Sequence, residues 1–247
     1  MQNKILTIIP VRLASTRLPN KPLADICGKT MIHRVYEQAK KAGLGDIVIA
    51  CDGQEIADEA RKIGAKFIIT DPNLPSGTDR IYAALKGLEN QDFDVIVNLQ
   101  GDLPNIDPAV IKDAASALLQ SDSDIATVAS KITKTSEITN PNVVKIAIAF
   151  QKENIGLALY FSRSAIPYSK ENSADYYHHI GIYAYKKSAL EKFVKLAPSP
   201  LEKRESLEQL RALENNMKIA VKIVDAHPLS VDTKEDLEII TNIIKND

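Results

Sequence analysis

The sequence predicts an α/β fold whose core is a doubly wound, mainly parallel sheet with an antiparallel subregion. Through the first half, buried strand patterns alternate with amphipathic helix patterns, and this rhythm is typical of parallel strands joined by right-handed crossovers. In the second half, strand patterns follow one another with fewer helices between them. A chain of 247 residues is long enough to bury a sizeable core of this kind. We therefore expect one Rossmann-like sheet that the later strands extend.

The first half repeats a strand and a helix in regular order. The opening strand is a nearly continuous apolar run, as expected of a strand buried on both faces. In chain order the segments are a strand at 4–11, a helix at 30–43, a strand at 46–51, a helix at 53–65, a strand at 66–70, a helix at 77–89, a strand at 93–100 and a helix at 107–120. In such sheets ligands bind outside the carboxyl ends of the strands.

The second half is richer in strands. Its segments are strands at 125–132, 142–150, 155–162 and 179–186, a helix at 188–196, a polar amphipathic helix at 201–215, a strand at 218–226 and a helix at 233–246. Asp232 precedes the last helix as a candidate N-cap, with Glu235 at the capping-box position. No linker or repeat interrupts the pattern, so we expect a single domain over 1–247.

Composition excludes several classes of function. The formal net charge is −1, so no overall field favours nucleic acid or an anionic membrane, and any anion site must be a local cluster of cations. No apolar stretch reaches the roughly 18 residues of a membrane span, and the start of the chain lacks the pattern of a signal peptide. Cys27 and Cys51 lack metal-ligand spacing, which fits a reducing cytoplasm.

A cluster of cations follows the first strand. Arg12, Arg17 and Lys21 lie within a proline-stiffened stretch that suits a polyphosphate, because Arg offers a planar fork and Lys a compact charge to phosphate oxygens. No glycine occurs before residue 28, so the stretch matches neither the P-loop nor the dinucleotide-binding glycine pattern. The alternative is a solvated surface loop with scattered cations.

A second polar cluster follows the strand at 93–100. Gln100, Gly101 and Asp102 stand where that strand ends, and a carboxylate there can hold Mg²⁺, which usually takes one or two protein carboxylates together with substrate phosphates. Asp232 is the second candidate ligand. Both aspartates can instead be read as turn or helix-cap residues, since spacing alone does not bring them together.

Eight motifs in order across the whole chain resemble those of the 3-deoxy-manno-octulosonate (KDO) cytidylyltransferases. The opening loop alone also occurs in other sugar nucleotidyltransferases, whereas the later motifs make the resemblance specific. The motifs are IPVRLASTRLPNKPL (9–23), SGTDR (76–80), VNLQGD (97–102), NPNVVK (140–145), ALYFSR (158–163), HHIGIYAY (178–185), PSPLE with LEQLR (198–211) and VDTKEDL (231–237).

The resemblance implies a fold of the nucleotide-diphospho-sugar transferase type and a cytoplasmic enzyme of lipopolysaccharide biosynthesis. CTP and KDO would give CMP-KDO and diphosphate, with Mg²⁺ as cofactor. The first part of the chain, 1–120, would mainly bind the nucleotide, and 121–247 would bind the sugar and form a homodimer. Nucleic acid and membrane are not expected partners.

The resemblance also assigns roles to individual residues. Arg12, Lys21 and Asp102 would be catalytic, and Asp102 and Asp232 would bind the metal. The implied nucleotide-binding residues are Arg12, Ser15, Arg17, Lys21 and Arg80. The implied sugar-binding residues are Gln100, Arg163, His179, Tyr183, Glu208 and Gln209. A carboxylate-bearing sugar makes an arginine on the pocket wall chemically reasonable. We find no convincing protein base, and His179 is the least implausible one.

Three positions depart from the family pattern. Leu103 stands where the family usually has glutamate, beside a candidate metal ligand. Asn20 replaces a usual glycine, and asparagine tolerates the positive φ that such a turn requires. His178 replaces a frequent arginine, which removes a permanent charge near the sugar.

Two other readings of the sequence stay open at this point. The first is a transferase of CMP to another acidic keto-sugar, such as sialic acid or an amino-KDO. The second is a catalytically silent nucleotide-binding protein, for which Leu103 is the motive. Both metal-site aspartates argue against the silent protein, which has little need of them.

Overall fold

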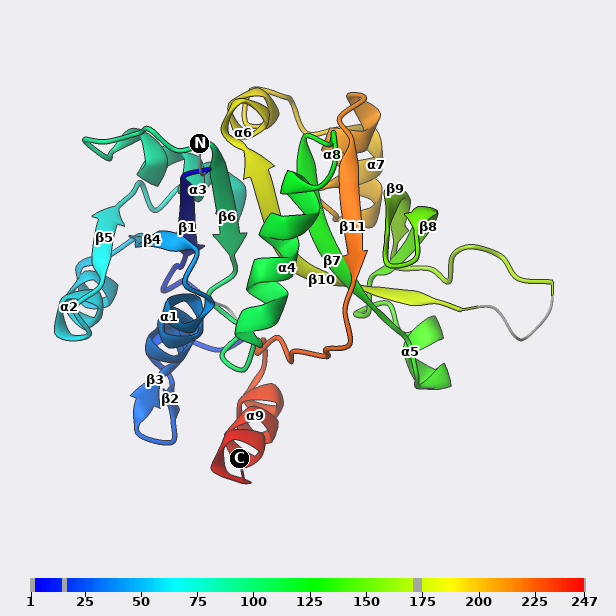
Figure 1. Ribbon diagram of the computed structural model, residues 1–247. Coiled ribbons are helices and arrows are strands. Elements are labelled where there is room, and N and C mark those ends of the chain that lie inside the picture. Colours follow the sequence, from blue (N-terminus) through cyan, green and yellow to red (C-terminus); the bar gives the residue numbers. More distant parts are fainter. Residues whose placement is uncertain (1–2, 15–16, 171–174, 247) are drawn as a thin grey trace. The chain divides into compact units, whose positions relative to one another are not determined.

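The computed structural model describes residues 3–14, 17–170 and 175–246, in two compact units. The first unit comprises Met1–Lys112 together with Pro228–Asp247, and the second comprises Asp113–His227. Each unit carries its own strands and helices (Figure 1). The second unit is therefore inserted, in sequence, between the body of the first unit and its C-terminal segment.

The first unit is built on four parallel strands. In the sheet their order is β5 (Lys66–Ile69), β4 (Gly45–Cys51), β1 (Ile5–Pro10), β6 (Val95–Leu99). β1 lies in the middle and pairs with β4 from Ile5↔Gly45 and with β6 from Ile5↔Val95. The side chains of β6 are all buried, which explains why its sequence is apolar except for Asn98, whose Oδ1 accepts a hydrogen bond from Gln100. The predicted parallel sheet is confirmed here.

Helices and a small hairpin complete the first unit. The helices are α1 (Met31–Ala42), α2 (Gln54–Lys62), α3 (Gly77–Lys86), α9 (Lys234–Asn246) and the single 3₁₀ turn η1 (Lys21–Leu23), and α4 (Pro108–Leu119) contains the boundary between the units. α1 ends at Gly43, whose left-handed φ of 62° suits glycine. The hairpin of β2 (Asp25–Ile26) and β3 (Lys29–Thr30) was not predicted, because two-residue strands leave no periodic pattern.

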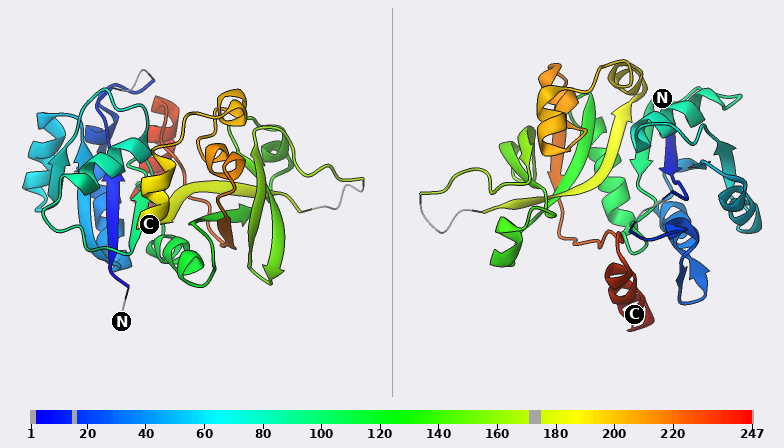
Figure 2. Two further views of the ribbon diagram at one scale, coloured as in Figure 1. Left: turned by 90° about the horizontal axis from the view of Figure 1, so that it is seen from above. Right: turned by 180° about the vertical axis from the view of Figure 1, so that it is seen from behind.

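The second unit contains the predicted antiparallel subregion. Its strands are β7 (Ile125–Lys131), β8 (Lys145–Lys152), β9 (Ile155–Ser162), β10 (Tyr177–Lys186) and β11 (Ile219–Ile223). The order is β10-β7-β11-β9-β8, and only the β11–β7 pair among them is parallel. The long strand β10 (yellow in Figure 2) also reaches β8, where His178 is opposite Lys145.

One predicted helix of the second unit is wrong. The segment 201–215 forms two short helices, α7 (Pro200–Glu205) and α8 (Leu210–Glu214), because Ser206 adopts a left-handed φ of 53° and ends the first of them. The periodic pattern continues across this break and conceals it. The remaining helices are α6 (Lys187–Phe193), which was predicted, and α5 (Thr135–Thr139), which was not.

The C-terminal segment belongs to the first unit. Val231 and Ile240 are buried with Leu18, Ile26 and Met31 in one apolar cluster. In Figure 1, α9 (red) accordingly ends the chain beside the blue N-terminal segments of the same unit. The division predicted at residue 120 placed this segment with the second half, and only its packing reveals where it belongs. None of the helices in the described ranges is long and apolar enough to cross a membrane.

Gly101 is required where the end of β6 approaches the end of β1. A Cβ atom at Gly101 would lie 2.3 Å from Val11 Cγ1 and 3.1 Å from the Pro10 carbonyl oxygen. We predict that Gly101→Ala lowers the free energy of unfolding by about 1–3 kcal/mol, since it overpacks a rigid contact. Urea unfolding measures this loss. Gly181→Ala is the control, because a Cβ there meets nothing within 4 Å, and an equal loss in both variants would contradict the explanation.

Candidate active site

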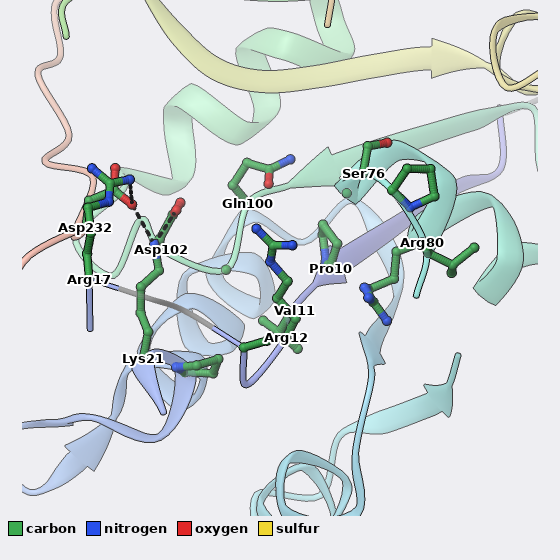
Figure 3. Close-up of a pocket in the computed structure, with 16 residues that line it drawn as sticks. Pro10, Val11, Arg12, Arg17, Lys21, Ser76, Arg80, Gln100, Asp102 and Asp232 are labelled. Carbon is green, nitrogen blue, oxygen red and sulfur yellow. Dashed lines mark hydrogen bonds and ion pairs between the residues drawn. The ribbon is translucent and has the colours of Figure 1, made fainter. Parts of the chain in front are cut away.

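A polar cavity of about 650 Å³ opens at the carboxyl ends of β1 and β6, within the first unit. Its charged wall is formed by four cations, Arg12, Arg17, Lys21 and Arg80, and two carboxylates, Asp102 and Asp232. Figure 3 shows Arg17 and Lys21 directed toward Asp102 and Asp232, whereas the Arg80 side chain points away from this group. Cations outnumber carboxylates, so the cavity favours an anion.

Lys21 is the centre of this cluster. Its Nζ donates to Asp102 Oδ2 at 2.8 Å and to Asp232 Oδ1 at 3.0 Å (dashed in Figure 3), and its side chain is only 16% exposed. Burial opposes the charged ammonium, but the two carboxylates outweigh it and raise the pKa of Lys21. Arg17 adds a second cation at 3.3 Å from Asp232 Oδ1. The two predicted metal ligands, 130 residues apart in sequence, are thus neighbours in space.

Backbone structure brings the two carboxylates together. The Val231 N–H donates to the Asp102 carbonyl oxygen at 3.0 Å. Because Asp232 directly follows Val231, this hydrogen bond brings Asp232 close to Asp102. Val231 is fully buried in the same apolar cluster as Leu18, from the loop that carries Arg17 and Lys21. Apolar packing and one hydrogen bond therefore fix the positions of the charged side chains.

The N-terminus of α9 is capped differently from our prediction. Thr233 Oγ1 accepts from the Asp236 N–H at 3.2 Å, and the Asp236 carboxylate accepts from the N–H groups of Thr233 and Asp232 at 2.9 and 3.0 Å. The capping box is thus formed by Thr233 and Asp236. The predicted capping box of Asp232 and Glu235 was wrong. Because Asp236 caps the helix, the carboxylate of Asp232 is left to face Lys21.

The loop between Arg12 and Lys21 has a defined turn at its end. Asn20, which stands where a glycine is usual, adopts a left-handed φ of 54°. The 3₁₀ turn η1 begins directly after it, with Pro22 in its first turn. Arg12 lies exposed at the start of the loop and lines the cavity. Ser15, predicted to bind the nucleotide, lies outside the described residues.

Arg80 is part of the buried wall of the cavity. It is only 2% exposed, and its Nη1 donates to Thr70 Oγ1 at 2.6 Å and to the Asp71 carbonyl at 3.3 Å. Burial lowers the pKa of Arg80, although an arginine stays charged in proteins. Gln100 also lines the cavity, and its Nε2 donates to the buried Asn98 Oδ1 at 2.8 Å. Arg80 and Gln100 are therefore held in place before any ligand arrives.

The two aspartates fit a magnesium ion. Their oxygens lie within 3.0 Å of a single cationic atom, the Lys21 Nζ. Mg²⁺ is a hard cation that binds oxygen and completes its shell with water and substrate phosphates. Across the described part of the chain, no group of three or more His, Cys, Asp or Glu side chains could hold a metal. A site of this kind therefore needs the substrate to supply further ligands.

Leu103 lies away from the cavity. Its side chain is 4% exposed and packs in the core, and it is not among the residues that line the cavity. The departure from the family pattern at this position thus replaces a carboxylate with a core side chain. Gln100, Gly101 and Asp102, which precede it, line the cavity.

His179 and Tyr183, two of the predicted sugar-binding residues, lie together on β10 in the second unit. Their ring centroids are 5.4 Å apart, and the His179 ring also packs edge-on against Phe161 at 5.0 Å. His179 Nε2 is 3.0 Å from Thr127 Oγ1, and complete burial lowers its pKa to about 3. Burial also raises the pKa of Tyr183. His179 is therefore neutral near pH 7 and a poor proton acceptor.

Glu208 and Gln209 lie between α7 and α8. Gln209 is 7% exposed, and its buried Nε2 has no hydrogen-bond partner within the described residues. Such a donor costs free energy unless a ligand oxygen accepts from it. Burial, and after it the charges of Tyr185 and Glu208, raise the pKa of Tyr183. Arg163 donates three hydrogen bonds to backbone carbonyls, so its guanidinium is largely committed to the protein.

A family model described as cytidylyltransferase matches residues 6–219. Curated relatives named 3-deoxy-manno-octulosonate cytidylyltransferase include one from Brucella canis, 54% identical over 95% of this chain and 93% of the relative, and one from Parvibaculum lavamentivorans, 51% identical over 94% and 90%. The chain belongs to the 3-deoxy-manno-octulosonate cytidylyltransferases. The resemblance seen in the sequence motifs is confirmed.

Solved structures agree with the cytidylyltransferase fold. A CMP:2-keto-3-deoxy-manno-octonic acid synthetase solved with CTP is 36% identical, with a TM-score of 0.91 over 98% of this chain and 99% of that one. A UDP-glucose pyrophosphorylase is 14% identical, with a TM-score of 0.70 over 98% and 99%, which shows the shared fold alone. The predicted nucleotide-diphospho-sugar transferase type is therefore confirmed.

Several contributors to this cytidylyltransferase site were not predicted. Ser76 and Gly77 line the cavity at the start of α3, and Ser76 Oγ caps that helix by accepting from the Asp79 N–H at 3.1 Å. Their motif was noted only for its arginine, although a serine three residues before an aspartate is a capping signal. Val231 carries no chemical signal, because its contribution is a backbone N–H.

The neutral state of His179 makes stability depend on pH. The pKa of an unfolded histidine is about 6.5, so as the pH falls the unfolded chain binds this proton first, and stability present above pH 6.5 is lost toward pH 3. We predict that His179→Gln removes up to about 1.4 kcal/mol per pH unit from the wild-type slope between pH 6 and 4. Urea unfolding at several pH values measures both slopes, and parallel slopes would show that His179 is not responsible.

Proposed function

We propose that this enzyme transfers CMP from CTP to KDO, giving CMP-KDO and diphosphate, as part of lipopolysaccharide biosynthesis. The observation that carries the proposal is the cavity lined by four cations, two of which, Lys21 and Arg17, contact the adjacent carboxylates of Asp102 and Asp232. The names of the relatives and the CTP complex of the 36% identical synthetase support the identities of the two substrates.

The cations of the cavity would hold the triphosphate. Arg12 and Arg17 can donate paired N–H groups to phosphate oxygens, and Lys21 can place its ammonium against one of them. The anomeric hydroxyl of KDO forms the new bond to the α-phosphorus while the bond to diphosphate breaks. Charge then grows on the phosphoryl and diphosphate oxygens, so cations already fixed around them stabilise the transition state.

Asp102 and Asp232 would bind Mg²⁺ in this enzyme. When bound, the ion supplies positive charge at the phosphates and lowers the pKa of a coordinated hydroxyl. In the ligand-free protein both carboxylates contact Lys21 Nζ. When Mg²⁺ and the nucleotide bind, the Lys21 ammonium would move from the carboxylates to the phosphate oxygens. The protein would act by positioning the substrates and stabilising charge, because His179, whose pKa burial lowers to about 3, is a poor proton acceptor.

The keto-sugar acid would be bound by Gln100 of the first unit and by four residues of the second unit, His179, Tyr183, Glu208 and Gln209. Gln209 Nε2 offers a buried donor that a sugar hydroxyl or carboxylate oxygen can accept from. Neutral His179 and protonated Tyr183 provide further hydrogen-bonding groups in an aromatic setting. Discrimination between KDO and another acidic keto-sugar would depend on these groups, because the cavity of the first unit serves the nucleotide.

A pyrophosphate-release assay tests the reaction. The purified protein is mixed with CTP, KDO and Mg²⁺, and the controls omit KDO or replace it with sialic acid. Release that depends on KDO is expected. Release with another keto-acid only would overturn the choice of sugar, and silence with every acid despite CTP binding would overturn catalysis and favour a nucleotide-binding protein.

Asp102→Asn tests the metal site. We predict a loss of turnover of at least about 100-fold, because the substitution removes a charged ligand, with the unfolding free energy little changed. The measurement is pyrophosphate release across a range of Mg²⁺ concentrations. Asp122→Asn is the matched control, since the Asp122 side chain is 95% exposed. Normal turnover of Asp102→Asn would remove Asp102 from the metal site.

We also propose that the enzyme is a cytoplasmic homodimer. CTP and the two free thiols fit the cytoplasm. Leu159 of the β8–β9 hairpin is 63% exposed and Phe150 46%, and apolar side chains of this size on a strand pair are suited to an interface between copies. Light scattering on the purified protein tests the dimer, and a monomer at micromolar concentration would contradict it.

A further inference from the structure

Lys145 is the most buried charged side chain of the second unit and has no part in the proposed chemistry. It is the first residue of β8, and its exposed fraction is 0%. Its Nζ donates to three backbone carbonyls, those of Asn140 at 2.8 Å, Val143 at 2.6 Å and Arg163 at 2.5 Å. An ammonium has three N–H groups, so all its donors are used, and all three acceptors are neutral.

The Lys145 contacts continue through Arg163. The guanidinium of Arg163 donates to the carbonyls of Glu205 at 2.9 Å, Pro141 at 2.9 Å and Ser206 at 3.4 Å. The Glu205 carboxylate in turn accepts from Ser162 Oγ at 2.7 Å and from the Arg163 N–H at 3.0 Å. Two cations thus tie the loop at 140–143, the end of β9 and the turn after α7 into one network.

Both ends of this network reach the sugar-side residues. On one side, the Val144 carbonyl next to Lys145 accepts from the His179 N–H at 2.9 Å. On the other, Ser206 is held in its left-handed conformation two residues before Glu208 and three before Gln209. A shift of the 205–206 backbone would therefore move the buried amide of Gln209.

We infer that Lys145 is a positioning residue for the keto-sugar acid, acting through Arg163 and the backbone of 205–206 on Glu208 and Gln209. This inference rests on the proposed function. Arg163 would then act on the sugar indirectly, because its guanidinium holds the backbone carbonyls of Glu205 and Ser206 in place. An apolar side chain at position 145 would fill a similar volume but would remove one N–H donor from each of three partly buried carbonyls. Within the described residues, only the Asn140 carbonyl also accepts from a backbone group, the Val143 N–H at 3.1 Å, so packing alone does not explain the lysine.

The test compares Lys145→Met with Lys152→Met, its matched control on the same strand at an exposed position. Pyrophosphate release gives kcat and the KM for KDO at saturating CTP, and calorimetry gives the CTP dissociation constant. Lys145→Met should raise the KM for KDO by about 10-fold or more, because small displacements of binding groups are costly, and leave CTP binding unchanged. Lys152→Met should change neither. A wild-type KM for KDO in Lys145→Met, or equal losses for both substrates, would overturn the inference.

A second variant guards against loss of folding. Arg163→Lys keeps a cation but lacks the planar fork, so it should show the same rise in KM for KDO with normal CTP binding. In the double variant Lys145→Met with Arg163→Lys, the loss should be smaller than the product of the single losses, because one residue acts through the other. Multiplicative losses would overturn the proposed route.

Hydrogen exchange separates this inference from the proposed function. Without any substrate, the amides of 205–209 should exchange faster in Lys145→Met than in the wild type and in Lys152→Met. Unchanged exchange would overturn the positioning role whatever the reaction is. If the wild type releases no pyrophosphate with KDO, the proposed function fails, while faster exchange still supports the positioning of Glu208 and Gln209.

Discussion

The mutual repulsion of two adjacent carboxylates is the constraint on which the first unit depends. Asp102 and Asp232 are drawn together by a backbone hydrogen bond from Val231 and by the apolar cluster around that residue. The two negative charges repel one another at short range, and a cation between them offsets this repulsion. Lys21 supplies that cation in the ligand-free protein. The same concentration of negative charge suits the pair to a divalent cation, whereas the cations that line the cavity suit it to a polyanionic partner.

The protein uses buried lysines in two contrasting ways. Lys21 faces carboxylates whose charge other cations can satisfy, so it can exchange partners when a ligand binds. Lys145 faces three partly buried backbone carbonyls, so moving it would take one charged N–H donor from each of them. An ammonium among carboxylates suits a group that takes part in a reaction, and an ammonium among carbonyls suits a fixed support.

Much of the fold and of the first site was predictable from sequence, for physical reasons. Strands such as β1 and β6 are buried and leave largely apolar runs. Arg12 and Asp102 follow these runs within three residues, and Lys21 lies on the loop after the first of them. The proximity of Asp232 to Asp102 was not predictable from residues alone, because it depends on a backbone N–H and on which core the last helix joins. The break at Ser206 was missed because the helical pattern continues across it, and the role of Lys145 was missed because its acceptors are carbonyls that every residue possesses.

The return of the last twenty residues to the first unit has a consequence for how the enzyme is made. Ribosomes synthesise the chain from its N-terminus, so Lys21 and Asp102 emerge long before Asp232. Until Asp232 and Val231 leave the exit tunnel, the nascent chain has one carboxylate where the finished protein has two. Prematurely terminated chains that lack this segment would contain all the strands β1 to β11 and yet lack half of the cation-binding pair. The carboxylate pair is therefore complete only after the segment with Val231 and Asp232 has been synthesised.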